Sequence, residues 1–241
     1  MAALPDKNSE TSKKRQVEEM FNDISPKYDL LNHLLSANID KLWRNRVVRM
    51  LEQKQPKTII DIATGTADFA LAASRIKNSI ITGIDISEGM LEVGRVKIVK
   101  NGLNDRIKLV KADSENLPFE QDSFDAAIVG FGVRNFETLK KGLSEIFRVL
   151  KPGGEFYVLE FSRPSKTPVK QFYRFYFTRI LPLVGGMISK NRNAYTYLPE
   201  SVNEFPDGVN FLAILAETGF TGTQYFEQTF GIATIYKACK P

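Results

Sequence analysis

Residues Thr58–Ala73 read TIIDIATGTADFALAA and carry the pattern of a strand, a tight turn and a helix in succession. A β-branched run leads to Asp61, a turn follows around Gly65, and small apolar residues continue as a helix. An α/β protein that binds an adenosine-bearing ligand uses this arrangement. A dinucleotide site would carry Gly-x-Gly-x-x-Gly, whereas Gly65–Ala70 has alanine at the second and third glycine positions. The missing glycines restrict which ligand this turn accepts.

The alternation of strands and helices continues along the chain after this stretch. Its strands are short apolar runs, which are typical of parallel strands covered by helices on both faces. At the C-terminal end, two β-rich runs separated by Gly231 follow a helix over Val209–Thr218 and predict a hairpin. We therefore predict a doubly wound α/β fold, a mostly parallel seven-stranded sheet closed by a C-terminal β-hairpin. This Rossmann-like layout is typical of class I S-adenosylmethionine-dependent methyltransferases. The predicted parallel strands are Thr58–Ala63, Ile80–Ile86, Ile107–Ala112, Phe124–Phe131 and Glu155–Phe161, and the helices between them are Asp68–Lys77, Gly89–Asn101 and Leu139–Leu150.

The composition is that of a globular protein and excludes several kinds of site. Of 241 residues, 43% are hydrophobic and 25% are charged, so the chain can bury a sizeable core. Cys239 is the single cysteine, which excludes an internal disulfide and favours a reducing compartment. His33 is the single histidine, so we expect no metal site built from several His and Cys ligands. The net charge of +5 is mild, and even the run Lys13–Arg15 is interpreted as solvated surface.

The chain divides into three segments. Residues 1–12 are polar and predict a disordered N-terminus, residues 13–55 predict a helical cover, and residues 56–241 form the α/β domain. No stretch has the apolar core of a signal peptide or the ~18 uncharged apolar residues of a membrane span. We therefore expect a cytoplasmic protein that binds no nucleic acid and is able to contact the inner face of the cell membrane peripherally.

The turn after the first strand favours a ligand without phosphate. A pyrophosphate requires a glycine where the backbone approaches it, but Ala67 occupies that position and an acid, Asp68, follows. A sulfonium ligand carries no phosphate, and its positive charge is favourable beside carboxylates. The turn at Gly65 therefore indicates S-adenosylmethionine rather than a nicotinamide dinucleotide.

Two further polar groups follow neighbouring strands. Asp85 follows Gly65 at the spacing at which an acid binds ribose hydroxyls, although an acid after a strand is also a common turn residue. Asp113 and Ser114 follow the third strand, where their side chains would reach an adenine edge; the alternative is an ordinary turn or helix cap. Together with Gly65, these residues predict an adenosine site.

At these residues the sequence resembles the ubiquinone/menaquinone biosynthesis C-methyltransferase family, over nearly the whole chain. YDLLNHLLSANIDKLWR, from Tyr28 to Arg44, is similar to an N-terminal signature of that family, and FRVLKPGGEFYVLEFSRP, from Phe147 to Pro164, is similar to a second one. FGVRN, residues 131–135, also matches. The resemblance implies that Thr66, Asp85, Asp113 and Ser114 bind S-adenosylmethionine. Three positions depart from the family pattern, namely His33, Asp40 and Ala67.

The resemblance implies C-methylation of a prenylated hydroquinone, most closely of demethylmenaquinol to menaquinol. The alternative is the equivalent methylation of a 2-polyprenyl-6-methoxy-1,4-benzoquinol in ubiquinone biosynthesis. Arg134 and Asn135 follow the fourth strand and are the candidate catalytic residues. Arg134 would hold a water or stabilise a phenolate; equally, it would pair with a carboxylate structurally. Tyr28 would reach the site from the helical cover or serve in packing.

An aromatic stretch with interspersed arginines, Phe172–Leu183, is interpreted as a surface that guides a polyprenyl tail, with plain core as the alternative. Three other functions are alternatives to methylation of a quinol. Ala67 disfavours a nicotinamide oxidoreductase, and the absence of basic clusters with interleaved aromatics disfavours an RNA methyltransferase. A non-catalytic scaffold with this fold would be expected to have an eroded cofactor turn, whereas Gly65, Thr66 and Asp85 are present.

Overall fold

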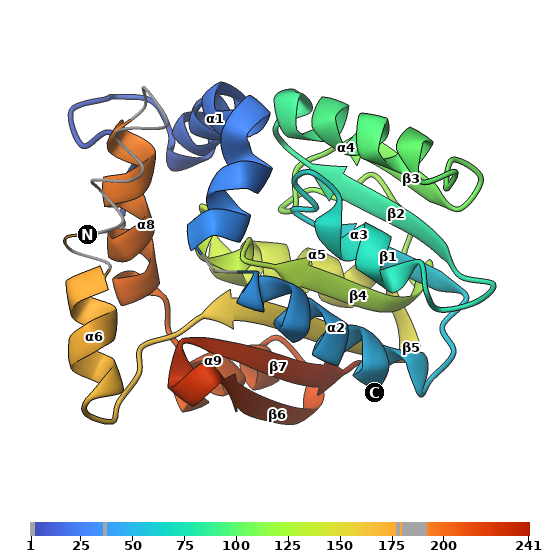
Figure 1. Ribbon diagram of the computed structural model, residues 1–241. Helices are drawn as coiled ribbons and strands as arrows, with labels where there is room; N and C mark the ends of the chain where they lie inside the picture. Colours follow the sequence, from blue (N-terminus) through green and yellow to red (C-terminus); the bar gives the residue numbers. More distant parts are fainter. Residues whose placement is uncertain (1–2, 36–37, 177–178, 180–191) are drawn as a thin grey trace.

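Strands and helices follow one another along the chain from residue 58 onward, although no helix lies between the strands Ile107–Lys111 and Phe124–Gly130 (Figure 1). The computed structural model describes residues 3–35, 38–176, 179 and 192–241. Of residues 30–35 and 192–195 it describes the backbone only. The elements in chain order are α1 (Lys13–Leu35), α2 (Ile39–Glu52), β1 (Thr58–Ile62), α3 (Asp68–Ala73), β2 (Ile80–Asp85), α4 (Glu88–Lys100), β3 (Ile107–Lys111), β4 (Phe124–Gly130), η1 (Val133–Asn135), α5 (Leu139–Val149), β5 (Leu150–Phe161), α6 (Val169–Phe175), α8 (Arg192–Glu204), α9 (Val209–Glu217), β6 (Thr221–Gln228), η3 (Thr229–Gly231) and β7 (Ala233–Cys239).

The sheet has seven strands in the order β3-β2-β1-β4-β5-β7-β6. Strands β1 to β5 pair in parallel, whereas β7 is antiparallel to both β5 and β6. The order reverses after β3, since β1 lies between β2 and β4, which places a crevice at the carboxyl ends of these strands. The predicted doubly wound sheet closed by a C-terminal hairpin is confirmed.

Two apolar layers cover the faces of the sheet. On one face, α2, α3 and α4 bury residues such as Val47, Phe69 and Ile98 against the strands. On the other face, α5 and α9 bury residues such as Leu143 and Phe211. Figure 1 shows α2 and α3 in front of the sheet and α5 behind it. Burial on both faces is the reason why the strands read as continuous apolar runs in the sequence.

Two predicted boundaries differ from the structure by more than two residues. The helix predicted over Asp68–Lys77 ends at Ala73. It ends there because the Arg106 guanidinium takes the carbonyl oxygens of Ser74 and Ile76, at 2.8 and 2.7 Å, in place of further helical amides. The strand predicted from Glu155 begins at Leu150, which pairs with Phe124 before the register shifts.

The N-terminal helices lie against the sheet. Figure 1 shows α1 between α8 and α4, and α2 along the face of the sheet. Ahead of α1, Ala3 is buried and Lys7 forms a 2.9 Å ion pair with Glu200 of α8. The division into segments 1–12, 13–55 and 56–241 stays a prediction. No helix within the described residues has the length and apolarity needed to span a bilayer.

Candidate functional site

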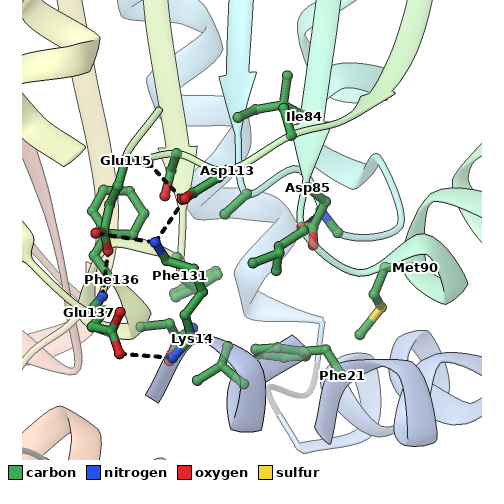
Figure 2. Close-up of a pocket in the computed structure, with 18 of the residues that line it drawn as sticks. Lys14, Phe21, Ile84, Asp85, Met90, Asp113, Glu115, Phe131, Phe136 and Glu137 are labelled. Atoms are coloured by element: carbon green, nitrogen blue, oxygen red, sulfur yellow. Dashed lines mark hydrogen bonds and ion pairs between the residues drawn. The ribbon is translucent and has the colours of Figure 1, made fainter. Parts of the chain in front are cut away.

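A pocket opens at the carboxyl ends of β1 to β4 and is covered by α1 (Figure 2). It contains about 690 Å³ of empty space, open solvent included. Five of the seven site residues predicted from the sequence line it, Gly65, Asp85, Asp113, Ser114 and Asn135. The remaining lining residues are Lys14, Val17, Phe21, Tyr28, Ala63, Ile84, Ile86, Met90, Ala112, Glu115, Gly130, Phe131, Gly132, Phe136 and Glu137.

The turn after β1 is tight and is held by Asp85. Gly65 has φ +55°, and its backbone N–H donates to Asp85 Oδ2 at 2.8 Å. Ala67 also has a left-handed conformation, with φ 65°, where a side chain is disfavoured. The N–H of Ser87 donates to Asp85 Oδ1 at 2.9 Å. Burial raises the pKa of Asp85 to about 6, and its carboxylate oxygens retain lone pairs for further donors.

A second buried acid lies beneath the same turn. Asp61 is fully buried, and its Oδ2 accepts a 2.6 Å hydrogen bond from Thr64 Oγ1. Its Oδ1 is buried and has no hydrogen-bond partner among the described residues. Burial raises the pKa of Asp61 to about 7. Two buried carboxylates at this turn oppose a dianionic pyrophosphate and favour a ligand with a positive centre.

At the opposite side of the pocket, Asp113 is held from two directions. Its Oδ1 accepts the backbone N–H of Glu115 at 2.9 Å, and its Oδ2 accepts from Lys14 Nζ at 2.8 Å. Glu115 is buried and accepts the backbone N–H groups of Glu137 and Thr138 at 2.7 and 3.0 Å. The loop that carries Asp113 is thereby tied both to α1 and to the start of α5.

Thr66 lies in the turn after β1, but its side chain contacts α1 and α4 and does not line the pocket. Its Oγ1 donates to Asp29 Oδ1 of α1 at 2.5 Å and lies 3.2 Å from Lys97 Nζ of α4. Lys97 also pairs with Asp68 and, at 2.9 Å, with Asp29. The Thr66 side chain therefore joins α1 to the cofactor turn, and only its backbone remains available for a ligand. Its assignment as a cofactor-binding residue stays a prediction.

Arg134 forms a buried ion pair at the end of β4. Its Nη1 donates to Glu160 Oε1 at 2.7 Å and to the carbonyl oxygen of Phe131. Glu160 is fully buried, and burial raises the pKa of its carboxyl group. Arg134 Nε is buried and makes no hydrogen bond with the described residues. The structural alternative for Arg134, pairing with a carboxylate, is present, and a catalytic role for it stays a prediction.

Asn135 is the polar side chain of η1 that lines the pocket. Its Oδ1 accepts a 3.0 Å hydrogen bond from the hydroxyl of Tyr197, which is 3% exposed and comes from α8. This bond leaves the Asn135 amide N–H groups for a ligand. Tyr28 lines the same pocket from α1, with a ring carbon 4.0 Å from the place of a Cβ on Gly65. Its ring also packs edge-on against Phe21, with ring centroids 6.0 Å apart, so the packing role is present and a role in the site stays a prediction.

Asp40 and His33 are the two other positions that depart from the family pattern. Asp40 forms a buried ion pair with Arg44 four residues later in α2, and Arg44 also lies 3.8 Å from Asp68. Asp40 therefore has a structural role next to the turn. The side chain of His33 lies outside the described residues.

Only the first part of the aromatic stretch Phe172–Leu183 lies within the described residues. Phe172 and Phe175 on α6 are 66% and 56% exposed, so neither side chain belongs to the core. Tyr173 is largely buried next to Arg134 and Glu160, and its pKa is raised by burial. Phe177 and residues 180–183 lie outside the described part of the chain.

Several site residues were not predicted from the sequence. Glu160 carried a signal, because an acid inside the apolar run FYVLEF is unusual in a buried strand. Lys14 and Tyr197 carried none, since their neighbours along the chain do not indicate what they contact. Lys14 and Tyr197 reach the site through the packing of α1 and α8 against the end of the sheet, whereas Glu160 lies on β5 itself.

Comparisons with known proteins agree with this geometry. A sequence profile of the ubiE/COQ5 methyltransferase family matches residues 9–240. A demethylmenaquinone methyltransferase from Bacteroides fragilis is 44% identical over 97% of this chain and 96% of its own length. A ubiquinone/menaquinone biosynthesis C-methyltransferase from Geobacter sulfurreducens is 45% identical over 94% of this chain and 89% of its own length. The crystal structure of a SAM-dependent methyltransferase from Thermotoga maritima superposes with a TM-score of 0.67, at 17% identity, over 93% of this chain and 99% of that one. The last similarity supports the fold alone.

Proposed function

Because the chain belongs to the ubiE/COQ5 methyltransferase family, we propose that it transfers a methyl group from S-adenosylmethionine to a ring carbon of demethylmenaquinol, giving menaquinol. This reaction would be the last step of menaquinone biosynthesis. The observation that carries the proposal is the pocket itself, which Gly65, Asp85, Asp113, Ser114 and Asn135 line together. Donor and acceptor would thus be bound within one pocket, as transfer between two bound molecules requires.

Four residues would hold the cofactor. Asp85 offers carboxylate oxygens to the ribose hydroxyls, and Asp113 with Ser114 offers polar groups to the adenine edge. Gly65 allows the backbone to approach the ligand, since a side chain is disfavoured at its φ of +55°. Buried Asp61 and Asp85 favour a positive charge at the turn. S-adenosylmethionine, when bound there, supplies an electrophilic methyl group.

The ring carbon must be made nucleophilic by the other half of the site. A ring carbon gains electron density as the neighbouring hydroxyl gives up its proton. When the new carbon–carbon bond is complete, the methylated ring carbon loses its hydrogen as a proton and the hydroxyl regains one, so that one proton is released for each methyl group transferred. Asn135 lines the pocket and would orient that hydroxyl through its amide N–H groups. Arg134 precedes Asn135 in η1 and pairs with Glu160; its positive charge would stabilise a phenolate, but being always protonated it does not serve as the base itself.

The same site would also accept the benzoquinol ring of the alternative substrate. The ubiE/COQ5 family and the Geobacter sulfurreducens relative carry names that include ubiquinone biosynthesis. Methylation of a 2-polyprenyl-6-methoxy-1,4-benzoquinol is therefore the alternative. The Bacteroides fragilis and Porphyromonas gingivalis relatives, named for demethylmenaquinone, favour the first substrate.

We also propose peripheral contact with the inner face of the cell membrane, where a polyprenylated substrate resides, for a protein otherwise in the cytoplasm. Exposed Phe172 and Phe175 lie on α6 beside Lys170 and Arg174, which are also exposed. Residues 161–199 contain no Asp or Glu. Basic residues around exposed aromatic rings suit an anionic lipid surface.

Methyl transfer to purified quinols tests the function. We expect turnover of reduced demethylmenaquinol, detected as menaquinol by mass spectrometry, and none of the oxidised quinone, because the quinone ring is electron-poor and lacks an ionisable hydroxyl. The polyprenyl-methoxybenzoquinol is assayed in parallel. Preference for that ring would replace the first proposal by the alternative. Equal turnover of quinol and quinone with reductant excluded would refute the mechanism.

A further inference from the structure

The first turn of α1 carries two adjacent lysines whose side chains are directed to the rim of the pocket rather than to solvent. Lys13 Nζ donates to the carbonyl oxygens of Arg134 and Phe136 at 3.1 and 3.0 Å. Lys14 Nζ lies 2.8 Å from Asp113 Oδ2 and 3.4 Å from Glu115 Oε2. Figure 2 shows Lys14 between these two carboxylates. The interpretation of the run Lys13–Arg15 as solvated surface is therefore wrong for both lysines.

The rest of α1 is attached along its length to the same edge of the sheet. Asn22 Oδ1 accepts from the backbone N–H of Gly89 and from Ser87 Oγ, at 3.0 and 2.7 Å, at the start of α4. Further along the helix, Asp29 holds Thr66 in the cofactor turn. Between these attachments, α1 side chains line the pocket. The helix is therefore a cover with Lys14 at the end next to Asp113.

We propose that Lys14 retains the cofactor by closing α1 over its adenine end. The inference rests on the proposed cofactor site, because Asp113 is the residue expected at the adenine edge. Lys14 occupies one oxygen of Asp113 and holds that carboxylate against the loop, while its aliphatic stem lines the pocket. A ligand beneath α1 leaves only after the bonds between Lys14 and the two carboxylates open. Lys14 is thus a positioning residue whose loss accelerates ligand release.

The charges that surround this contact determine how it responds to salt. Lys14 meets Asp113 and Glu115 with its ammonium group, and its backbone N–H lies 3.4 Å from Glu137 Oε1. The Lys14 and Asp113 side chains are 27% and 30% exposed, so salt reaches the pair and weakens it. Rising NaCl should therefore increase the dissociation rate of a bound cofactor product in the wild-type protein.

Release of S-adenosylhomocysteine from the full-length protein tests the inference by stopped-flow displacement. We expect Lys14→Met to raise the dissociation rate about 1.5- to fivefold, the range for a partly exposed ion pair. In Lys14→Met the dissociation rate should also no longer depend on the NaCl concentration. Lys14→Arg should restore a rate near wild type, because it keeps the charge. Arg15→Met is the matched control, since Arg15 in the same turn pairs with Glu19 and both are well exposed.

Three outcomes are decisive. A Lys14→Met dissociation rate equal to that of Arg15→Met, with unchanged thermal unfolding, overturns the inference. Should Lys14→Met fold poorly, a wild-type rate that does not change with salt overturns it equally, and Lys14→Gln provides a milder variant. Absence of S-adenosylhomocysteine binding by the wild-type protein would instead overturn the cofactor assignment beneath it, which keeps the two failures distinct.

Discussion

Cofactor affinity should depend on pH through Asp85. Burial raises the pKa of this carboxyl group to about 6, with the side chain held by the N–H groups of Gly65 and Ser87. The ionised form accepts hydrogen bonds from two ribose hydroxyls, whereas protonation converts one oxygen into a donor. We therefore expect the ionised form to bind with full affinity and the neutral form to bind weakly.

The size of the effect follows from the fraction of Asp85 that is ionised. With a pKa of about 6, that fraction is about 0.9 at pH 7 and about 0.1 at pH 5, so the Kd for S-adenosylhomocysteine should rise about tenfold between them. Stability of the free protein changes in the opposite sense. The unfolded chain ionises first, near its ordinary value of 3.8, so the contribution of Asp85 to the free energy of unfolding decreases as pH rises from about 4 to about 6.

Isothermal titration calorimetry from pH 5 to pH 8 measures this dependence. Asp85→Asn should weaken binding about ten- to hundredfold at pH 7, from the loss of hydrogen bonds to a charged group, and should remove the step near pH 6. A change in Kd that remains near pH 7 in this variant would then be assigned to Asp61, whose pKa is about 7. Asp125→Asn is the control, because Asp125 lies at the opposite end of the sheet and pairs with Lys151.

Two results would refute the reasoning. One is a Kd that stays constant from pH 5 to pH 8 in the wild-type protein. The other is a step near pH 6 that persists in Asp85→Asn. Either result would show that the ribose hydroxyls do not bind the Asp85 carboxylate.

Two further predictions concern the substrate half of the site. Glu160→Gln should lower kcat up to about 100-fold with an unchanged Kd for S-adenosylhomocysteine, because Arg134 and η1 lose the negative charge that orients them. Tyr197→Phe should lower kcat about fivefold, because Asn135 loses one hydrogen bond, and Tyr225→Phe on β6 is its control. A parallel loss of cofactor affinity in either variant would contradict a role confined to the substrate side. Replacing Phe172 and Phe175 by Ser should lower kcat/KM for long-chain quinols and spare a short-chain analogue, because only the tail loses contacts. The control replaces Val96 and Val99 of α4, which are similarly exposed, by Ser; an equal loss for both substrates together with a lowered Tm would show that the two phenylalanines stabilise the fold and do not guide the tail.

Features that depend on neighbours along the chain could be predicted from the sequence. The β1–turn–α3 pattern, the parallel strands and the C-terminal hairpin follow from periodicity and turn residues, because the central strands bury both faces. Asp85 and Asp113 were predicted in one site because Asp85 ends β2 and Asp113 follows β3, and parallel strands bring their carboxyl ends to one edge. The end of α3 was predicted less well, since beyond it Arg106, distant in sequence, takes the carbonyl oxygens of Ser74 and Ile76.

The partners of long polar side chains were decided only by the tertiary structure. Thr66 belongs to the turn by sequence, yet its hydroxyl bonds Asp29 because α1 packs over that turn. The sequence left Arg134 open between a catalytic and a structural role until β5 placed Glu160 beside it. A charged side chain has the same local sequence pattern whether it lies in solvent or meets a carboxylate across a pocket. Its role is determined by the packing of α1 and α8 against the end of the sheet, which is why the sequence alone indicated the cofactor but not the contacts that Lys14, Thr66 and Tyr197 make.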